Sequence, residues 1–395
     1  MGFEDASQVC TGILSSSDTG KKTTALSLNS IINLDHGDPT MFEPYWRNLG
    51  EKCKLVISGS DVMSYFSDPG NICWFLEPKL ANAIRALHRL VGNAVAEDRH
   101  ILVGTGSTQL FQAALFALST PDAPEPISVV STAPYYSSFK EEVEFLRSGL
   151  YKWQGDAKTF HKEGPYIEVV TSPSNPDGTI RRAVVNREGG KLIHDLAYYW
   201  PQYTPITGAA DHDVILFTFS KCTGHAGSRI GWAIVKDEQV ARRMTKFIEL
   251  SSIGVSKESQ LRAAKILEVL NDGLQNGTGS ENFFEYGRHI MAKRWFELRH
   301  IVKSNSKIFG LPEYPVEFCN FSKGITIAHP AFAWLESKQD EDIEKLLRAH
   351  KMLCRTGTRF GSERKYVRIS MLSRDEVFDE FLERLAAIKG GTENQ

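Results

Sequence analysis

Short apolar runs, separated by polar turns and helix-length segments, recur along the chain from about Ile101 to Val235. Runs of this kind are typical of strands that are buried on both faces of a sheet. The segment after the first run repeats Leu110, Ala114 and Leu118 at the spacing of one helical face. Alternating strands and helices predict an α/β fold with a mostly parallel sheet, whose binding crevice lies at the carboxyl ends of the strands. The predicted strands cover residues 101–103, 127–130, 167–171, 192–194, 214–219 and 230–235.

The same pattern divides the chain into four predicted parts. Residues 1–30 are rich in Ser, Thr and Gly and lack hydrophobic periodicity, which predicts a mobile tail. Residues 61–280 are expected to form a large domain, and residues 281–395 a smaller domain that the segment 31–60 joins. The boundary is placed in the Gly- and Asn-rich stretch 271–279, before a long helical pattern.

Composition and charge exclude several classes of protein. The 395 residues include 46 Lys+Arg and 48 Asp+Glu, a net charge of −2 with both signs interspersed, so nucleic acid is not an expected partner. No apolar run reaches the length of about 18 residues that a membrane span needs, and no signal-peptide pattern is found. Six cysteines without metal-ligand or paired spacing predict neither a metal site nor a disulfide framework. A globular protein of the cytoplasm is the expected result.

Lys221 is the residue with the clearest chemical signal. It closes an apolar run, and the small residues Gly224, Ala226 and Gly227 follow before Arg229 arrives eight positions later. An amine that is partly desolvated and near cations has a lowered pKa, which a Schiff-base lysine requires. The alternative is an ordinary lysine at the end of a strand, with its amine in water.

Three other motifs follow predicted strands. Asp195 ends one run and Tyr198 comes three residues later, so a carboxylate and a phenol could point into one crevice. Asn175 lies in a Pro- and Gly-containing turn after another run, where a capping role is the alternative. The turn Gly104–Thr108 leads into a helix N-terminus, which favours a phosphate. That turn is neither a P-loop nor a dinucleotide fingerprint.

Taken in chain order, these motifs resemble the fold-type I pyridoxal-phosphate enzymes, the aspartate aminotransferase superfamily. Within it, the chain looks like the plant tryptophan aminotransferases of auxin synthesis, and the resemblance extends from about Asn33 to about Lys389. That family is similar to the catalytic part of alliinase, although this chain lacks the cysteine-rich module of alliinase. The segments that carry the resemblance are 33–39, 63–68, 103–109, 194–200 and 219–232.

The resemblance implies pyridoxal 5'-phosphate as the cofactor and a role for each matching residue. Lys221 would form the Schiff base and move a proton, and Asp195 would face the pyridine nitrogen. Tyr198 and Asn175 would hydrogen-bond the phenolic oxygen of the ring, and Tyr136 would stack on the ring, with the adjacent Tyr135 as the alternative. The phosphate would be held by Gly106, Ser107, Thr108, Ser220 and Arg229.

Three further residues follow from the same resemblance. Tyr65 matches a tyrosine that reaches the phosphate of the neighbouring subunit, which implies a homodimer. Arg368 matches the arginine that binds the substrate carboxylate, and Gly37 matches a backbone position near that carboxylate. The alternatives are a surface arginine at the edge of a sheet and a simple turn glycine.

The implied function is that of a plant L-tryptophan:pyruvate-type aminotransferase. It would convert L-tryptophan to indole-3-pyruvate with a 2-oxo acid such as pyruvate, in auxin biosynthesis. The alternatives are an alliinase-like carbon–sulfur lyase, an aminotransferase with another aromatic donor, a non-catalytic relative and a nucleotide-dependent oxidoreductase. The aromatic residues that crowd the early part of the chain, some of which could line an indole pocket, are Phe42, Tyr45, Trp46, Tyr65, Phe66, Trp74 and Phe75.

Overall fold

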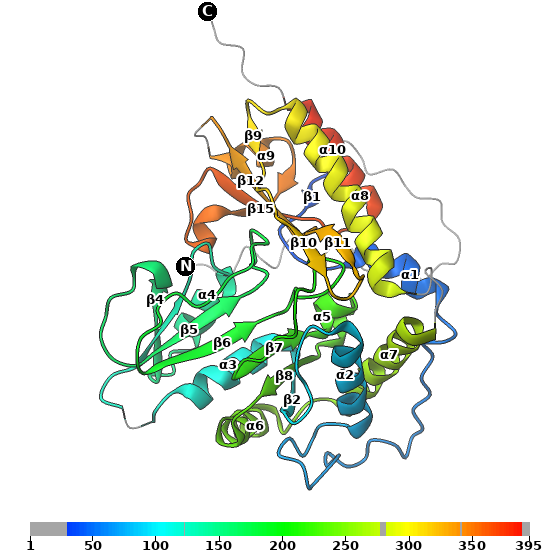
Figure 1. The fold of residues 1–395 in the computed structure, drawn as a ribbon, viewed down its shortest axis with the longest axis vertical. Helices are drawn as coiled ribbons and strands as arrows, with labels where there is room; N and C mark the ends of the chain where they lie inside the picture. Colours follow the sequence, from blue (N-terminus) through cyan, green and yellow to red (C-terminus); the bar gives the residue numbers. More distant parts are fainter. Residues whose placement is uncertain (1–29, 122, 277–281, 340–341, 389–395) are drawn as a thin grey trace, which may run out of the picture. The chain divides into compact units, whose positions relative to one another are not determined.

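The computed structural model describes residues 30–121, 123–276, 282–339 and 342–388. The predicted tail, residues 1–30, lies almost entirely outside this part of the chain. A sheet of seven strands in the order β2-β8-β7-β6-β5-β3-β4 forms the centre of the structure (Figure 1). All neighbouring strands are parallel except β8, which is antiparallel to both β2 and β7. The strands are β2 (His100–Gly104), β3 (Ile127–Ser131), β4 (Tyr151–Asp156), β5 (Tyr166–Thr171), β6 (Gly190–Asp195), β7 (Val214–Thr218) and β8 (Gly231–Val235).

Helices cover both faces of this sheet. Helix α3 (Gly106–Leu118) packs on one face of the sheet. It approaches β8 so closely that a Cβ atom on Gly231 would lie 2.6 Å from the backbone nitrogen of Ser107. Helix α6 (Glu238–Ser252) packs on α3. On the opposite face, the His88 ring of α2 (Pro78–Val91) lies 4.6 Å from the Phe217 ring of β7.

Helix α7 (Lys257–Asn276) packs beside α2 (Figure 1). It includes residues 271–276 of the Gly- and Asn-rich stretch, so this part of the predicted boundary is helical rather than a loop. None of the helices in the described ranges is long and apolar enough to cross a membrane.

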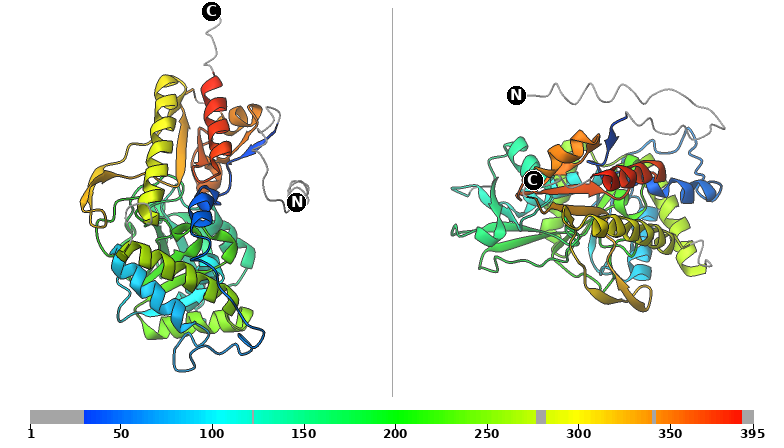
Figure 2. Two further views of the ribbon diagram at one scale, coloured as in Figure 1. Left: turned by 90° about the vertical axis from the view of Figure 1, so that its right-hand side faces the viewer. Right: turned by 90° about the horizontal axis from the view of Figure 1, so that it is seen from above.

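A second sheet follows in the chain, with four antiparallel strands in the order β14-β15-β12-β9. The strands are β9 (Phe309–Gly310), β12 (Phe332–Ser337), β14 (Arg355–Thr356) and β15 (Tyr366–Ser370). Two long helices, α8 (Phe283–Ser304) and α10 (Asp375–Ala387), run side by side next to it (Figure 2). The helix α9 (Ile343–Ala349) and the hairpin of β10 (Val316–Cys319) and β11 (Gly324–Ile327) also belong to this part of the chain.

The segment near residue 31 reaches this second part of the structure. Strand β1 (Ile32–Asn33) pairs in parallel with β13 (Met352–Leu353), and the short helix α1 (Glu43–Asn48) follows it. This pairing joins an early segment of the chain to a late one and places the residues after Asn33 beside the second part of the structure. The exact domain limits given above stay predictions.

Candidate active site

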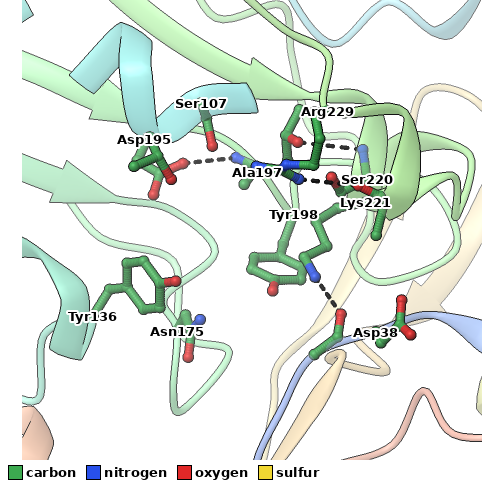
Figure 3. A pocket seen from close by; sticks show the side chains of 14 residues that line it. Asp38, Ser107, Tyr136, Asn175, Asp195, Ala197, Tyr198, Ser220, Lys221 and Arg229 are labelled. Atoms are coloured by element: carbon green, nitrogen blue, oxygen red, sulfur yellow. Dashed lines mark hydrogen bonds between the residues drawn. The ribbon is translucent and has the colours of Figure 1, made fainter. Parts of the chain in front are cut away.

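A cavity of about 250 Å³ lies at the carboxyl ends of β5, β6 and β7 (Figure 3). This is the edge of the sheet at which the sequence predicted a binding crevice. Gly106 and Arg368 contact residues that line the cavity, whereas Tyr65 lies elsewhere. The predicted residues that line it are Gly37, Ser107, Thr108, Tyr136, Asn175, Asp195, Tyr198, Ser220, Lys221 and Arg229.

Lys221 reaches the cavity from the one-turn helix α5 (Phe219–Cys222), which begins directly where β7 ends. The hydroxyl of Thr218 accepts a hydrogen bond of 3.2 Å from the backbone N–H of Ser220 and so caps this turn. The Nζ atom of Lys221 donates to the main-chain oxygen of Gly37. Burial, and then the charge of Arg368, lower the pKa of the Lys221 amine to about 8. A neutral amine, which is nucleophilic, is therefore accessible near neutral pH.

Asp195 lies on the other side of the cavity from Lys221 (Figure 3). It ends β6 and accepts one hydrogen bond of 3.1 Å, from the backbone N–H of Ala197. Burial raises the pKa of the carboxyl to about 6, and no cation of the described residues pairs with it. A largely buried carboxylate whose one side-chain hydrogen bond comes from a neutral donor is well suited to a positively charged nitrogen in the cavity, such as a protonated pyridine.

The cavity that Lys221 and Asp195 line also contains groups that can bind an anion. Ser107 and Thr108 lie in the first turn of α3, where unpaired backbone N–H groups and the helix dipole favour negative charge. The Arg229 side chain approaches Gly106, where a Cβ atom would lie 2.5 Å from Nη2. Gly106 also has a φ of 74°, so its lack of a side chain serves both the turn and the arginine. The groups present match what a phosphate ester requires.

Arg368 is buried, with 2% of its surface exposed, and contacts Asn175 of the cavity lining. It belongs to β15, an inner strand of the second sheet, so the interpretation as a surface arginine at a sheet edge is wrong. Its guanidinium packs 4.1 Å from the centre of the Phe332 ring. Nη1 donates to Oδ1 of Asn175 at 3.0 Å, and Nη2 donates to the main-chain oxygen of Asp35. Because Asn175 Oδ1 is used in this way, its amide nitrogen is left to donate into the cavity.

Two tyrosines complete the cavity wall. Burial raises the pKa of Tyr198 well above its usual value, so its side chain stays a neutral phenol that can donate a hydrogen bond. Tyr136 lines the cavity, whereas the ring of the adjacent Tyr135 packs 4.9 Å from Trp153 and is not part of the lining. Of the two tyrosines that the sequence offered for stacking on the cofactor ring, Tyr136 is therefore the one that lines the cavity.

Tyr65 is not brought to this cavity by its own chain. It is 58% exposed, its ring packs against Phe66 and Trp74, and it lines a separate surface hollow with residues 252–258. This placement leaves its predicted contact with a neighbouring subunit untested.

Other residues at the site were not identified from the sequence. Asp38 lines the cavity, and its charge favours the protonated form of Lys221. Its position directly after Gly37 was the available signal. Phe332, which supports Arg368, comes from β12 and gives no signal, because its role depends on a pairing of β12 with β15.

Known proteins are similar to this chain in sequence and in fold. Residues 32–389 match the family described as Allinase. The chain is 55% identical over 388 residues to "Tryptophan aminotransferase-related protein 2" of Oryza sativa subsp. japonica, which covers 94% of this chain and 76% of the relative. It is 36% identical over 358 residues to "Alliin lyase 2" of Allium sativum, which covers 88% and 74%.

Among solved structures, an aspartate aminotransferase of Thermus thermophilus matches with a TM-score of 0.62 and 17% identity, over 90% of this chain and 91% of that one. This match concerns the fold, and it confirms the predicted α/β architecture of the aspartate aminotransferase type.

Proposed function

The chain belongs to the allinase family of pyridoxal-phosphate-dependent proteins, and from this membership we propose that it is an aminotransferase of L-tryptophan. It releases indole-3-pyruvate and passes the amino group to a 2-oxo acid such as pyruvate, in auxin biosynthesis. The observation that carries the proposal is the position of the Lys221 amine opposite the Asp195 carboxylate, in a cavity that also offers an anion-binding helix N-terminus. The choice of L-tryptophan is supported by two relatives at 55% identity, each with the name "Tryptophan aminotransferase-related protein 2".

The residues of the cavity fit the cofactor group by group. Pyridoxal phosphate, when bound, supplies a ring that withdraws electrons from the substrate Cα. Asp195 would keep a proton at the ring nitrogen, and Tyr136 would pack against the ring face. Tyr198 and Asn175 would donate hydrogen bonds to the ring oxygen. The phosphate would be held by Gly106, Ser107, Thr108, Ser220 and Arg229.

Lys221 is the residue proposed to move protons. Its pKa of about 8 lets Nζ take up and release a proton near neutral pH. The bond from Nζ to the oxygen of Gly37 holds the amine at the side of the cavity where the N-terminal segment passes. Arg368 would bind the substrate carboxylate close by, because its guanidinium is already fixed by Asn175 and Phe332.

The indole ring is assigned to an adjoining cavity of about 410 Å³, which shares Asp38 and Ala226 with the site. Trp46 and His225 are partly exposed and contribute aromatic surface to it, and Phe42, which is 1% exposed, is also part of the lining. Of the aromatic residues near the start of the chain that were candidates for such a pocket, Phe42 and Trp46 line this cavity. Tyr45 and Phe75 are buried in the core, and Phe66 is exposed.

A homodimer is part of the proposal. Tyr65 and Phe66, exposed by 58% and 49%, lie near Ile253, which is exposed by 57% in the same surface hollow as Tyr65. Large apolar side chains gathered on one surface are typical of an interface. In the proposed dimer, Tyr65 reaches the phosphate in the partner's cavity. The cytoplasmic location stays a prediction from the sequence.

A carbon–sulfur lyase is the second candidate, because alliin lyases match 88% of the chain at 36% identity. Both reactions begin with removal of a proton at the substrate Cα, so Lys221 serves either. An aminotransferase that prefers another aromatic donor is a variant of the first candidate. Formation of pyruvate and ammonia from a cysteine sulfoxide would identify the lyase.

The test uses the holoprotein and L-tryptophan without any 2-oxo acid. We expect the cofactor absorbance band to shift, with about one equivalent of indole-3-pyruvate released per site, because the amino group stays on the enzyme. Adding pyruvate should restore the original band. A band that does not move with L-tryptophan, but yields pyruvate and ammonia with a cysteine sulfoxide, would replace the proposal by the lyase.

A further inference from the structure

The connection between the parallel strands β5 and β6 contains no helix among its residues 172–189, all of which the structure describes. An extended segment takes the place of the usual crossover helix. Glu168 holds it to the sheet by accepting hydrogen bonds of 2.8 and 3.1 Å from the backbone N–H groups of Val184 and Val185. Arg181 holds it at the other side through the main-chain oxygens of Thr132 and Pro134. The segment therefore covers β5 and leaves β6 open.

The open strand forms the floor of a cavity of about 680 Å³. Leu192 and His194 of β6 lie on the same face of the sheet as Glu168, since Glu168 pairs with Leu192 in the parallel register. One wall is the segment 180–186, and the other is the segment 207–212. Tyr199 fixes the second wall by donating a hydrogen bond of 2.9 Å to the oxygen of Gly208.

Two histidines in this cavity have unused polar atoms. The rings of His194 and His212 stack with centroids 3.5 Å apart and an angle of 5° between their planes. Nδ1 of His194 is buried and has no hydrogen-bond partner among the described residues, and the whole residue is only 6% exposed. Burial lowers the pKa of both rings, so each neutral imidazole offers one donor and one acceptor. An unpaired buried nitrogen such as Nδ1 of His194 is uncommon, and together with the partly exposed His212 ring it indicates a missing partner.

The charge of the cavity indicates what that partner is. Arg182 lines it, is exposed, and forms no ion pair with any described residue, while no Asp or Glu is part of the lining. The nearby Asp211 is already paired with Arg99 and Lys236. The floor and end of the cavity are apolar because Leu192 and Leu196 lie there.

We propose that this cavity is a binding site for a small organic anion, a carboxylate with an apolar body. The carboxylate would pair with Arg182 and an imidazole N–H, and the body would lie on Leu192 and Leu196. The site is separate from the cofactor cavity, and the proposal does not depend on the aminotransferase assignment. It lies directly behind that cavity, because His194 precedes Asp195 and the two side chains point to opposite faces of β6.

The test follows binding of 4-(trifluoromethyl)benzoate to the holoprotein by ¹⁹F NMR. Arg182→Glu reverses the charge at the rim, and Ala209→Trp fills the cavity from its exposed wall without removing a polar group. We expect each to raise the Kd about tenfold or more. Arg364→Glu, on another exposed arginine, is the matched control and should leave the Kd unchanged.

Thermal unfolding midpoints equal to wild type would show that the variants are folded. Binding of the probe at the catalytic site, next to Arg368, would be the same in all four proteins, so only a loss specific to Arg182→Glu and Ala209→Trp supports the proposal. Equal affinity in all four, or no binding to wild type, would overturn it.

Discussion

Nη1 of Arg368 donates a hydrogen bond of 3.0 Å to Oδ1 of Asn175, a residue 193 positions away in the chain. Arg368 belongs to the second sheet, whereas Asn175 follows β5 of the large sheet. The bond joins the residue proposed to bind the substrate carboxylate to a residue proposed to hold the cofactor ring. Phe332 packs on the guanidinium from one face and limits its movement.

This arrangement predicts how Arg368→Lys behaves. An ammonium group cannot form the paired bonds of a guanidinium, so we expect affinity for L-tryptophan to fall by about 10²-fold. Tryptamine has no carboxylate, and its affinity should change little. The two Kd values can be measured from the cofactor absorbance. Arg348→Lys, at an exposed helix position, is the control, and unchanged discrimination between the two amines would contradict the assignment.

Lys221→Ala should abolish turnover while the fold is retained. The change removes the only group assigned to proton transfer at the substrate Cα, a contribution of at least about 10²- to 10⁴-fold in rate. Thermal unfolding of the variant should remain cooperative, because the lysine makes one side-chain hydrogen bond, to Gly37. Lys152→Ala, at an exposed position of β4, should be fully active. An active Lys221→Ala protein would rule out the mechanism.

Asp195 gives a prediction about pH. Burial raises its pKa from 3.8 to about 6, so between these values the native cofactor-free protein binds more protons than the unfolded chain. Its free energy of unfolding therefore falls as the pH rises through this window, and the loss is complete above it. Asp195→Asn removes the loss. We expect the cofactor-free variant to be more stable than wild type by about 1–3 kcal/mol near pH 7.5.

The difference should shrink as the pH is lowered towards about 4.5, which urea unfolding at several pH values would show. The same variant should lose about 10²- to 10³-fold in kcat, because the charge that faces the ring nitrogen is gone. A stability gain that is equal at all pH values would mean that the carboxyl is not perturbed by burial.

Gly106→Ala tests the anion-binding turn. A methyl group would collide with Nη2 of Arg229 at 2.5 Å, and the φ of 74° is unfavourable for alanine. We expect the Kd for pyridoxal phosphate to rise about tenfold or more, with little change for pyridoxal, which lacks the phosphate. Gly59→Ala is the control, because a Cβ atom at Gly59 would have no atom within 4 Å beyond those of its chain neighbours. Equal losses for both compounds would show a general disturbance of the cavity.

The sequence predicts the strands of the large sheet more completely than it predicts the contacts of the site. Strands buried on both faces appear as continuous apolar runs, and each of the six predicted runs corresponds to a strand of the seven-stranded sheet. β4 was missed because it is an edge strand in which Lys152 and Gln154 are exposed. Asp195 and Lys221 could be expected to meet because both follow strands that end at one edge of the sheet.

Contacts between distant segments could not be predicted in the same way. The contact of Phe332 with Arg368 and the hydrogen bond from Lys221 to Gly37 depend on how the second sheet and the N-terminal segment pack on the large sheet. No local pattern encodes such packing. The open cavity beside β6 is a similar case, since it results from a crossover without a helix.

Trp46 tests the assignment of the indole pocket. Its ring lies 4.8 Å from that of His225, and its Nε1 donates a hydrogen bond of 2.8 Å to the main-chain oxygen of Thr223. Trp46→Leu removes most of this aromatic surface from the cavity beside Asp38. We therefore expect the KM for L-tryptophan to rise about fivefold or more, because an aromatic contact of this kind contributes roughly 1 kcal/mol beyond its buried area.

The same variant should leave the KM for L-alanine unchanged, since a methyl side chain does not reach the adjoining cavity. If the role of Trp46 were purely structural, the substitution would instead weaken the binding of both substrates and of the cofactor. Trp295→Leu is the control, because Trp295 belongs to α8 and lines neither cavity. If Trp46→Leu and Trp295→Leu raise the KM for L-tryptophan equally, the indole ring binds elsewhere.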